Sequence, residues 1–542
     1  MEKVAHRRGR IGLPLCNLQR HPRHSLPRAS DALPQASPLM LKIQVTHSYF
    51  LQYDPKQWER GKPYPPLATI QVAALLRRMG HGVALFDAML ADGVEAYEAS
   101  LPSAAPDVVV LYEDNFNFLT KMCLGRMREA ACRMIAAARA RGARVIVAGS
   151  DASDRPEPFL AAGADVVLAG EGIAALVQLI GRLDANPDID TQGWVAGLAG
   201  VSIVDAGQTR TARIGVQPPD AQLTGLPAWD LIDIERYRAL WLERHGWFSL
   251  NMTASRGCPF HCNWCAKPIW GNHYRRRDAG EVAVEMSYLK HAFRPDHIWF
   301  ADDIFGFHSD WVNEFAERLR DNDGGVPFTI QTRADISTEP MAAALERAGC
   351  AEAWIGAESG SQSVLDWMDK GTRVGKLVDA RKRLGAHGIR VGFFIQLGYL
   401  GEQLSDLLAT RELIKLAAPD DIGVSVSYPL PGTRFYEQVK TQLGEKTHWR
   451  DSGDLAMMFR GTYDSAFYRG FRDLLHEQVT LQQARGVDSP AARKRALAAL
   501  DARWDALIAS ESLHRNPDAT PAPLPHRDHV QPLRRVATAQ TH

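Results

Sequence analysis

The chain has 542 residues, 45% of them hydrophobic and 23% charged, and its 63 Lys and Arg residues are matched by 63 Asp and Glu residues. This length predicts two or three globular domains. The equal numbers of basic and acidic residues exclude binding to nucleic acid or anionic membrane that is driven by overall charge. No apolar run approaches the ~18 residues that a membrane span needs, and seven cysteines, three of them clustered, exclude a secreted disulfide framework.

Residues 1–39 form a leader that we expect to be disordered. They are rich in Arg, Pro, Ser and His and have no regular apolar period. Arg7 and Arg8 could begin an export signal, but no apolar segment follows them. Because regular patterning begins right after Met40, we expect either that the protein starts at Met40 or that the leader is dispensable.

Residues 40–200 alternate short apolar runs with helical patterns, which predicts an α/β domain with a flavodoxin-like (Rossmann-like), doubly wound parallel sheet. In such sheets ligands bind beyond the carboxyl ends of the strands. The expected strands span 42–46, 83–86, 108–111, 144–148 and 166–168, and the expected helices include 67–79 and 119–140. The candidate binding residues at these strand ends are Asp87, Asn115, Gly149, Ser150, Glu171 and Gly172.

Residues 201–246 are expected to form a linker with an edge strand at 201–204 and a short helix at 234–241. Residues 247–445 again alternate strands with helices, and their six βα units predict a partial (β/α)6 TIM-type barrel. Its expected strands span 249–254, 297–301, 328–331, 353–356, 391–397 and 423–427, and its helices 281–291, 311–320, 341–348, 374–387 and 406–416. Residues 446–512 predict a small helical C-terminal region, and the Pro-rich, polar residues 513–542 a disordered tail.

Three cysteines follow the first strand of the predicted barrel, at the end where parallel barrels carry their sites. Cys258, Cys262 and Cys265 have the spacing C-x3-C-x2-C. An iron–sulfur cluster normally takes four cysteines, so three thiolates would leave one iron open to a substrate or cofactor. Structural zinc needs four closed ligands, and His261 or His273 would have to complete the set, although His261 lies awkwardly beside Cys262. A chance group of buried thiols is the remaining alternative.

Other strand ends of the predicted barrel carry polar residues or glycine. Asp302 and Asp303 follow the second strand and could bind a metal, act as a base or accept a bond from an ammonium group, although Asp303 could instead cap a helix. Glu358 and Ser359 follow the fourth strand with a carboxylate and a hydroxyl group suited to hydrogen bonds. Gly398 lies in the turn after the fifth strand.

Several charged and thiol side chains remain open to more than one interpretation. Arg256, before the first cysteine, could pair with cluster charge or could pack structurally. The run 275–277 consists of three arginines and is typical of a solvated face, with an anionic substrate or a reductase docking patch as the alternative. Cys123 and Cys132 fall on one helical pattern and Cys350 at the end of another, so we expect all three to act as small buried residues.

The cysteine motif, with Trp264 before its last cysteine, resembles the signature of the radical S-adenosylmethionine (SAM) superfamily, and the six βα units match the barrel of that family. The resemblance implies a [4Fe–4S] cluster on the three cysteines, with SAM on the open iron. It further implies electron transfer that cleaves SAM to a 5′-deoxyadenosyl radical. Contacts to SAM, or for the aspartates to substrate, would come from Asp302, Asp303, Glu358, Ser359 and Gly398.

Residues 40–200 resemble the cobalamin-binding domain that is often fused in front of a radical SAM domain. The matching segments are 65–67, 80–83 with Asp87, and 169–172. The D-x-H-x-x-G motif, whose His ligates cobalt in the best-known cobalamin domains, is absent, so the resemblance implies cobalamin bound without a histidine ligand. A response-regulator-like domain that binds nothing is the alternative, because this fold hosts many ligands.

Together the two resemblances imply a cobalamin-dependent radical SAM enzyme, first of all a methyltransferase acting on an unactivated carbon of a small-molecule substrate. The alternatives are a radical cyclase or rearrangement enzyme without methyl transfer, similar to the oxygen-independent porphyrin ring cyclases, and a non-catalytic cobalamin or redox sensor. Methylthiotransferases are disfavoured, because the three further cluster cysteines that they need are missing from the N-terminal half. We expect a cytoplasmic location, flavodoxin or ferredoxin as the electron donor, and no nucleic-acid partner.

Overall fold

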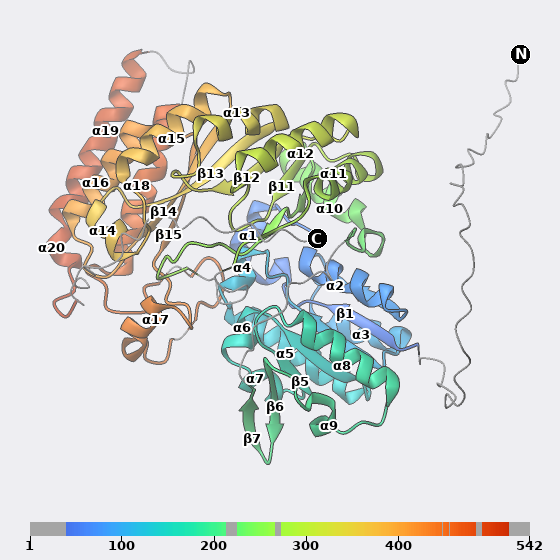
Figure 1. The fold of residues 1–542 in the computed structure, drawn as a ribbon. Helices are drawn as coiled ribbons and strands as arrows, with labels where there is room; N and C mark the ends of the chain where they lie inside the picture. Colours follow the sequence, from blue (N-terminus) through green and yellow to red (C-terminus); the bar gives the residue numbers. More distant parts are fainter. Residues whose placement is uncertain are drawn as a thin grey trace, which may run out of the picture. The chain divides into compact units, whose positions relative to one another are not determined.

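The computed structural model describes residues 40–212, 225–265, 273–446, 448–454, 456–483 and 490–519. These residues belong to one compact unit that begins at Met40, and Figure 1 shows its two sheets with their covering helices. The predicted leader and most of the predicted tail lie outside the described residues. In the described part of the chain no helix is long and apolar enough to cross a membrane.

The first sheet has seven strands in the order β2-β1-β3-β4-β5-β6-β7. The first five in chain order are parallel, and their arrangement 2-1-3-4-5 is that of flavodoxin-like folds, so the predicted doubly wound sheet is confirmed. The strands are β1 Lys42–Thr46, β2 Gly82–Phe86, β3 Val108–Tyr112, β4 Arg144–Ala148, β5 Val166–Leu168, β6 Val201–Asp205 and β7 Gln208–Thr211.

The strand predicted at 201–204 exists, but it is not an edge strand. β6 pairs antiparallel with β5 on one side and with β7 on the other, so β7 forms the edge. The Ala206-Gly207 pair, with φ angles of 48° and 79°, turns the chain between the two strands. The sheet therefore continues into the segment that was expected to be a linker.

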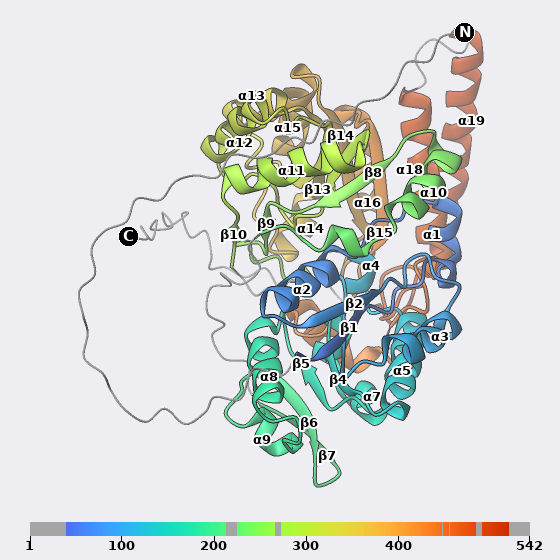
Figure 2. The same ribbon diagram turned by 90° about the vertical axis from the view of Figure 1, so that its right-hand side faces the viewer.

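Helices cover both faces of this sheet, as Figure 2 shows. On one face lie α2 Leu67–Arg78 and α8 Ile173–Ala185, and on the other α3 Val94–Ala104 and α5 Gly125–Ala140. All five residues of β3 are buried, as expected for a parallel strand that is covered on both sides. Short helices complete this half: η1 Leu51–Tyr53, α1 Pro55–Arg60, α4 Phe118–Lys121, α6 Ser150–Asp154, α7 Glu157–Ala161 and α9 Thr191–Val195.

The single helix predicted over 119–140 is two helices, α4 and α5, with a break between them. Cys123 lies in the break with φ of 54° and is therefore not helical. Residues far along the chain stabilise the break, because Gly125 N–H donates to Trp449 O at 2.8 Å and Arg126 N–H donates to Arg450 O at 3.2 Å. These are the backbone donors of the first turn of α5, which no helical carbonyl can satisfy.

The second sheet is the predicted barrel, with six parallel strands in the order β15-β14-β13-β12-β11-β8. Its strands are β8 Ser249–Met252, β11 His297–Phe300, β12 Phe328–Thr332, β13 Cys350–Glu358, β14 Arg390–Leu397 and β15 Asp421–Val426. Its helices are α11 Ala279–Phe293, α12 Ser309–Asp321, α13 Glu339–Ala348, α14 Gln362–Trp367, α15 Val374–Ala386 and α16 Leu404–Ala417. Cys350 begins β13 instead of ending a helix, because Gly349 with φ of 87° has already closed α13.

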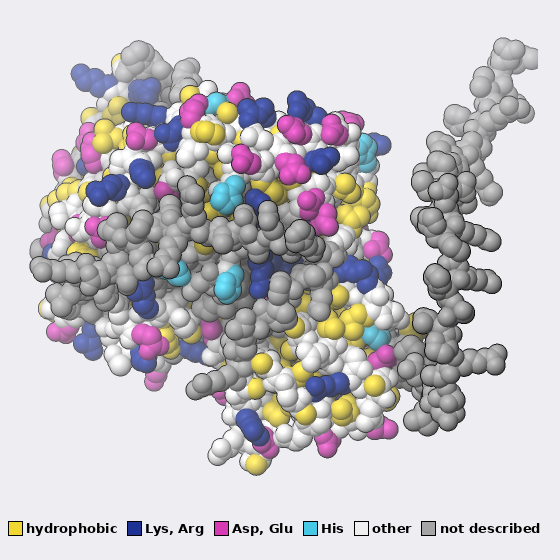
Figure 3. All heavy atoms as spheres, in the orientation of Figure 1, with side chains coloured by type: hydrophobic (Ala, Val, Ile, Leu, Met, Phe, Trp, Pro, Cys, Tyr) yellow, Lys and Arg dark blue, Asp and Glu magenta, His cyan; other side chains and the backbone are white. Residues whose placement is uncertain are grey.

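The remaining elements connect or cover these two halves. They are η3 Trp229–Leu231, α10 Ile234–His245, α17 Arg434–Val439, η4 Lys440–Gln442, α18 Ser465–Gln483, α19 Pro490–Ala509 and α20 Glu511–His514. Order continues past the expected start of the tail at residue 513, because Arg515 donates to Glu511 at 3.0 Å and to Gln403 at 2.8 Å. Acidic and basic side chains intermix on the face in Figure 3, in keeping with the balanced composition.

Candidate active site

The cysteine loop leaves β8 at the carboxyl end of the barrel strands, as the sequence predicts. After β8 the chain forms β9 Ser255–Arg256, which pairs antiparallel with β10 Arg275–Arg276. Ser255 Oγ donates to the carboxylate of Asp302, and Ala254 N–H donates to the same carboxylate at 3.0 Å. The end of the neighbouring strand β11 therefore holds the base of the loop that carries the cysteines.

Asn263, between the second and third cysteines, holds the other side of the loop. Its Nδ2 donates to Trp367 O at 2.6 Å, and its backbone N–H donates to Met368 O at 3.0 Å. Its side-chain oxygen accepts a bond from Tyr399 OH at 2.9 Å. These partners follow β13 and β14, so the loop is fixed by several strand ends at once. The sequence analysis missed Asn263, because its partners lie far along the chain.

Two buried cations lie beside Cys262, and the sequence analysis missed both. The side chain of Arg333 is 7% exposed, its Nη1 lies 3.7 Å from Cys262 Sγ, and its guanidinium lies 3.7 Å from the ring centre of Phe260. The side chain of Lys370 is also 7% exposed, and its Nζ lies 2.7 Å from Glu358 Oε1. Arg333 is the first residue after β12, so the rule that barrel sites lie at strand ends could have found it.

The three cysteines fit a cluster better than a single ion. Cys258, Cys262 and Cys265 are not joined in disulfides and are partly exposed. Among the residues that the structure describes, no group of three or more His, Cys, Asp or Glu side chains could hold one metal ion. In a cluster each thiolate binds its own iron, so the sulfur atoms need not converge on one point. Three thiols on one anchored loop therefore suit an iron–sulfur cluster.

The two aspartates after β11 have different environments. Asp302 is 1% exposed, and burial raises its pKa to about 7. The side chain of Asp303 is 26% exposed, and its Oδ1 lies 2.5 Å from Nζ of Lys121 in α4. Asp302 thus supports the cysteine loop, whereas Asp303 faces the other half of the chain. The alternative that Asp303 caps a helix is wrong, because α12 begins only at Ser309. Their contacts with SAM or substrate stay predictions.

The burial of Asp302 predicts a pH dependence of stability. Because burial raises its pKa from 3.8 to about 7, the folded chain holds this proton more tightly than the unfolded chain. The stabilising contribution is therefore complete below the lower value and is lost as the pH rises through the higher one. We compare the melting temperature of Asp302→Asn with that of the original chain in acidic buffer and in buffer above the folded pKa. We expect the difference between the two proteins to shift by several degrees in favour of Asp302→Asn at the higher pH. Asp310→Asn, an exposed change, is the control, and a constant difference would contradict the expectation.

Glu358 and Ser359, predicted to contact SAM, are held tightly at the end of β13. Glu358 has φ of 60°, a conformation that is uncommon for a residue other than glycine, and its carboxylate pairs with Lys370. Ser359 Oγ lies 3.2 Å from Thr410 Oγ1 and accepts a bond from Ser361 N–H at 3.1 Å. Backbone conformations of this kind concentrate at functional sites. Ser361 caps α14, and its side chain accepts a bond from Val364 N–H.

Gly398, after β14, lies in a turn closed by a buried carboxylate. Its N–H donates to Glu402 Oε2 at 2.6 Å. Burial raises the pKa of Glu402 to about 8, and its other oxygen has no hydrogen-bond partner among the described residues. The predicted contact of this turn with SAM stays a prediction.

Asp87, at the end of β2, joins the first sheet to the connector. His47 Nε2 lies 3.0 Å from Asp87 Oδ1, and Tyr237 OH in α10 donates to Asp87 Oδ2 at 2.6 Å. His47 is only 1% exposed. Both oxygens of the carboxylate are therefore engaged within the protein.

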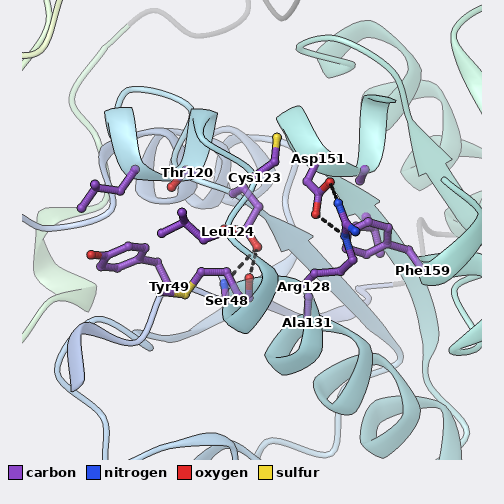
Figure 4. A pocket seen from close by; sticks show the side chains of 14 residues that line it. Ser48, Tyr49, Thr120, Cys123, Leu124, Arg128, Ala131, Asp151 and Phe159 are labelled. Atoms are coloured by element: carbon purple, nitrogen blue, oxygen red, sulfur yellow. Dashed lines mark hydrogen bonds and ion pairs between the residues drawn. The ribbon is translucent and has the colours of Figure 1, made fainter. Parts of the chain in front are cut away.

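A pocket opens at the carboxyl ends of β1, β3 and β4, and Figure 4 shows its lining. On one side Glu113 accepts bonds from Ser48 N–H at 3.1 Å and from Ser48 Oγ at 2.5 Å, and burial raises the pKa of Glu113. On the other side Arg128 Nε donates to Asp151 at 2.6 Å. The boundary between β1 and β3 is the switch point of this strand order, where flavodoxin-like folds bind ligands.

The other candidates at this end of the first sheet show one unsatisfied donor and two crowded glycines. Asn115 is fully buried, and its Nδ2 has no hydrogen-bond partner in the described part of the chain, while its Oδ1 lies 3.4 Å from Ser150 Oγ. Such a group calls for an explanation, because an unpaired buried donor is costly. A Cβ at Gly149 would lie 2.7 Å from the Glu113 side chain, and Gly172 has φ of 65°.

The carboxyl ends of the two sheets contact each other through ion pairs. Arg256 Nη1 lies 2.6 Å from Glu171 Oε1, and Arg256 Nη2 donates to Gln71 Oε1 at 2.8 Å. Lys121 and Asp303 form a second bond between the halves. Arg256 thus binds the first half of the chain through its guanidinium, two residues before the first cysteine. The candidate residues of both halves face a common boundary.

Comparisons with known proteins agree with this architecture. Residues 252–414 match the model of the Radical SAM superfamily, a segment that contains the cysteine motif. The chain is 27% identical over 296 residues to the uncharacterized methyltransferase PH0819 of Pyrococcus horikoshii, a match that covers 53% of this chain and 60% of that protein. The solved structure of the radical SAM methyltransferase TsrM from Kitasatospora setae is similar with a TM-score of 0.59 and 17% identity, over 74% of each chain.

A second solved structure, the cobalamin-dependent SAM radical enzyme OxsB, is similar with a TM-score of 0.62 and 17% identity, over 86% of this chain and 71% of that one. At this identity the two structural matches establish the fold alone, a flavodoxin-like sheet followed by a partial (β/α)6 barrel, and both predictions of fold are confirmed. The chain spans about 60% of the length of PH0819. The contacts of single residues with cofactors stay predictions.

Proposed function

We propose that this chain, whose residues 252–414 match the Radical SAM superfamily model, is a cobalamin-dependent methyltransferase acting on an unactivated carbon of a small molecule. The observation that supports the proposal is that the carboxyl ends of the strands of the two sheets contact each other. The cysteine loop lies at one set and the flavodoxin-like pocket at the other, and Arg256–Glu171 and Lys121–Asp303 join them. Two cofactors held at these faces would lie near each other.

The thiols of Cys258, Cys262 and Cys265 would hold a [4Fe–4S] cluster with SAM on its open iron. When bound, the cluster supplies the electron that cleaves SAM, and cobalamin supplies the methyl group. The chain's own residues would orient these groups: Glu358 and Ser359 next to SAM, with Asp302 and Asn263 keeping the cysteine loop in place. The names of PH0819 and TsrM, both methyltransferases, support this reaction class.

The first half of the chain offers features that suit a large polar cofactor. Asn115 Nδ2 is a buried donor without a partner among the described residues, and it lies beside Ser150 at the strand ends. The carboxyl ends of β1 and β3 lie at the ligand-binding position of this fold. We assign cobalamin to this face, with Asn115, Ser150, Gly149 and Gly172 beside it. The solved structures of TsrM and OxsB were determined with cobalamin bound, which supports this assignment.

The reaction needs a reductant, for which we name flavodoxin or ferredoxin. The run Arg275–Arg276 forms β10 beside the cysteine loop, and its positive charge suits an acidic electron carrier. A cluster of this kind and cysteines that are not joined in disulfides are sensitive to oxidation, so we place the enzyme in the cytoplasm.

Anaerobic reconstitution tests the proposal. The protein is supplied with iron, sulfide and hydroxocobalamin, and the cluster and corrinoid are quantified from ultraviolet–visible spectra. Dithionite and SAM are then added, and 5′-deoxyadenosine is measured by mass spectrometry. We expect about one cluster and one corrinoid per chain, and cleavage of SAM to 5′-deoxyadenosine. A protein that binds the cluster but no corrinoid would overturn the methyltransferase proposal.

A matched pair of variants tests whether the corrinoid binds at the first sheet. Asn115→Ala removes the buried amide, and we expect it to weaken corrinoid binding about fivefold, because one net hydrogen bond contributes about 1 kcal/mol. Asn322→Ala, after α12, is the control and should bind corrinoid normally. Melting temperatures of both variants separate lost binding from lost folding. Equal affinity in the two variants would move the corrinoid away from Asn115.

A further inference from the structure

Arg333 is fixed in one position beside the cysteine loop. Its Nε lies 2.9 Å from Asp335 Oδ1, and its Nη2 donates to Lys370 O at 2.7 Å. These bonds leave Nη1 directed at Cys262 Sγ, at 3.7 Å. The face of the guanidinium covers Phe260, with 3.7 Å to the ring centre. A guanidinium that is stacked and hydrogen-bonded on several sides is pre-organised, so little freedom is lost when it donates to the sulfur.

Lys370 brings a second positive charge to the same place. It is 6% exposed and pairs with Glu358 at 2.7 Å. The carboxylate of Glu358 and the ammonium of Lys370 form a buried ion pair, and Lys370 O accepts the bond from Arg333 Nη2. In such surroundings water screens charge weakly.

The charge of a three-thiolate cluster makes these cations important. Such a cluster is an anion in its oxidised state, and the electron that reduces it adds further negative charge. The potential of a cluster depends on its net charge and on hydrogen bonds to its sulfur atoms. A hydrogen bond to a thiolate and a buried positive charge both favour the reduced state.

We propose that Arg333, assisted by Lys370, sets the reduction potential of the cluster, in addition to holding Phe260 and the loop. This inference rests on the proposed function, because it requires a cluster on Cys262. Arg333 is a positioning residue: it acts on the cluster through Cys262 and Phe260, and the electron itself comes from the flavodoxin or ferredoxin donor. Asp335 opposes the effect, because its carboxylate partly neutralises the guanidinium.

The test is a redox titration of the reconstituted cluster without SAM, followed by electron paramagnetic resonance of the reduced form. Arg333→Gln removes the charge, and we expect the ratio of reduced to oxidised cluster at a fixed potential to fall about tenfold, a shift of about 59 mV for one electron. Asp335→Asn keeps an acceptor for Arg333 but removes the opposing charge, and we expect a shift in the other direction. Arg347→Gln, at an exposed position near the end of α13, is the control and should leave the ratio unchanged.

The opposite signs separate this proposal from a purely structural role of Arg333. If both substitutions loosened the loop, they would change cluster content or shift the potential in the same direction, and either result would overturn the inference. If Arg333→Gln does not take up a cluster, Arg333→Lys replaces it in the test. This variant keeps the positive charge but loses the planar guanidinium, and it should shift the ratio of reduced to oxidised cluster less than tenfold. Failure of the original chain to bind a cluster would instead refute the proposed function itself.

Discussion

Cys262→Ala is expected to abolish the iron–sulfur cluster and, with it, the cleavage of SAM. Cys262 is the middle ligand of the motif and the thiol nearest to Arg333. Its removal leaves two thiolates for a cluster that already lacks one protein ligand. Loss of a residue that hydrogen-bonds to a metal ligand lowers metal affinity or activity about 10–100-fold. Loss of a ligand itself should therefore reduce SAM cleavage by more than about 100-fold. Iron and sulfide analysis and the yield of 5′-deoxyadenosine measure the two effects.

Cys132→Ala is the matched control for this change. Cys132 is also a free, partly exposed cysteine, but it lies in α5 of the first half, where its Sγ is 3.6 Å from Pro158 O. We expect this variant to keep the full iron and sulfide content and the original rate of SAM cleavage. A Cys262→Ala protein that still holds four irons and cleaves SAM would contradict the assignment of the cluster to the C-x3-C-x2-C motif.

The sequence predicted the strand ends well because parallel strands leave a strong local pattern. Runs of apolar residues, each followed by a polar residue or glycine, located β1, β4 and β5 at their observed bounds, and the order of the strands followed from flavodoxin-like topology. The cysteine spacing is likewise a local pattern. These features could be predicted because no residue far along the chain is needed to specify them.

Features that depend on distant residues could not be predicted. Nothing near Cys123 announces the break between α4 and α5, because backbone carbonyls at residues 449 and 450 stabilise it. Arg333 and Asn263 looked ordinary in the sequence, since their importance lies in contacts with residues about 70 to 140 positions away. Asp302 and Asp303 are adjacent and identical in type, yet burial and pairing give them different surroundings.

The ion pair between Arg256 and Glu171 is expected to hold the two halves together, and breaking it should be strongly destabilising. Its side chains are 16% and 9% exposed, and the two charges lie 2.6 Å apart. Removal of one partner from a buried pair leaves an uncompensated charge and costs about 3–5 kcal/mol. We therefore expect Glu171→Gln to lower the free energy of unfolding by about 3 kcal/mol, measured by urea titration of tryptophan fluorescence.

A double-mutant cycle isolates the pair from other contacts of its members. Arg256→Gln with Glu171→Gln removes both charges, and we expect it to be more stable than the sum of the single changes predicts. Asp230→Asn is the control, because its pair with Arg77 also links the first half to the connector but is 36% and 63% exposed. Exposed pairs contribute about 0.2–1 kcal/mol, so this change should have little effect. Since Arg256 lies two residues before Cys258, breaking the pair should also reduce the cluster content of the protein. If the stability losses of the two single variants add up in the double variant and the cluster content is unchanged, other contacts hold the halves together.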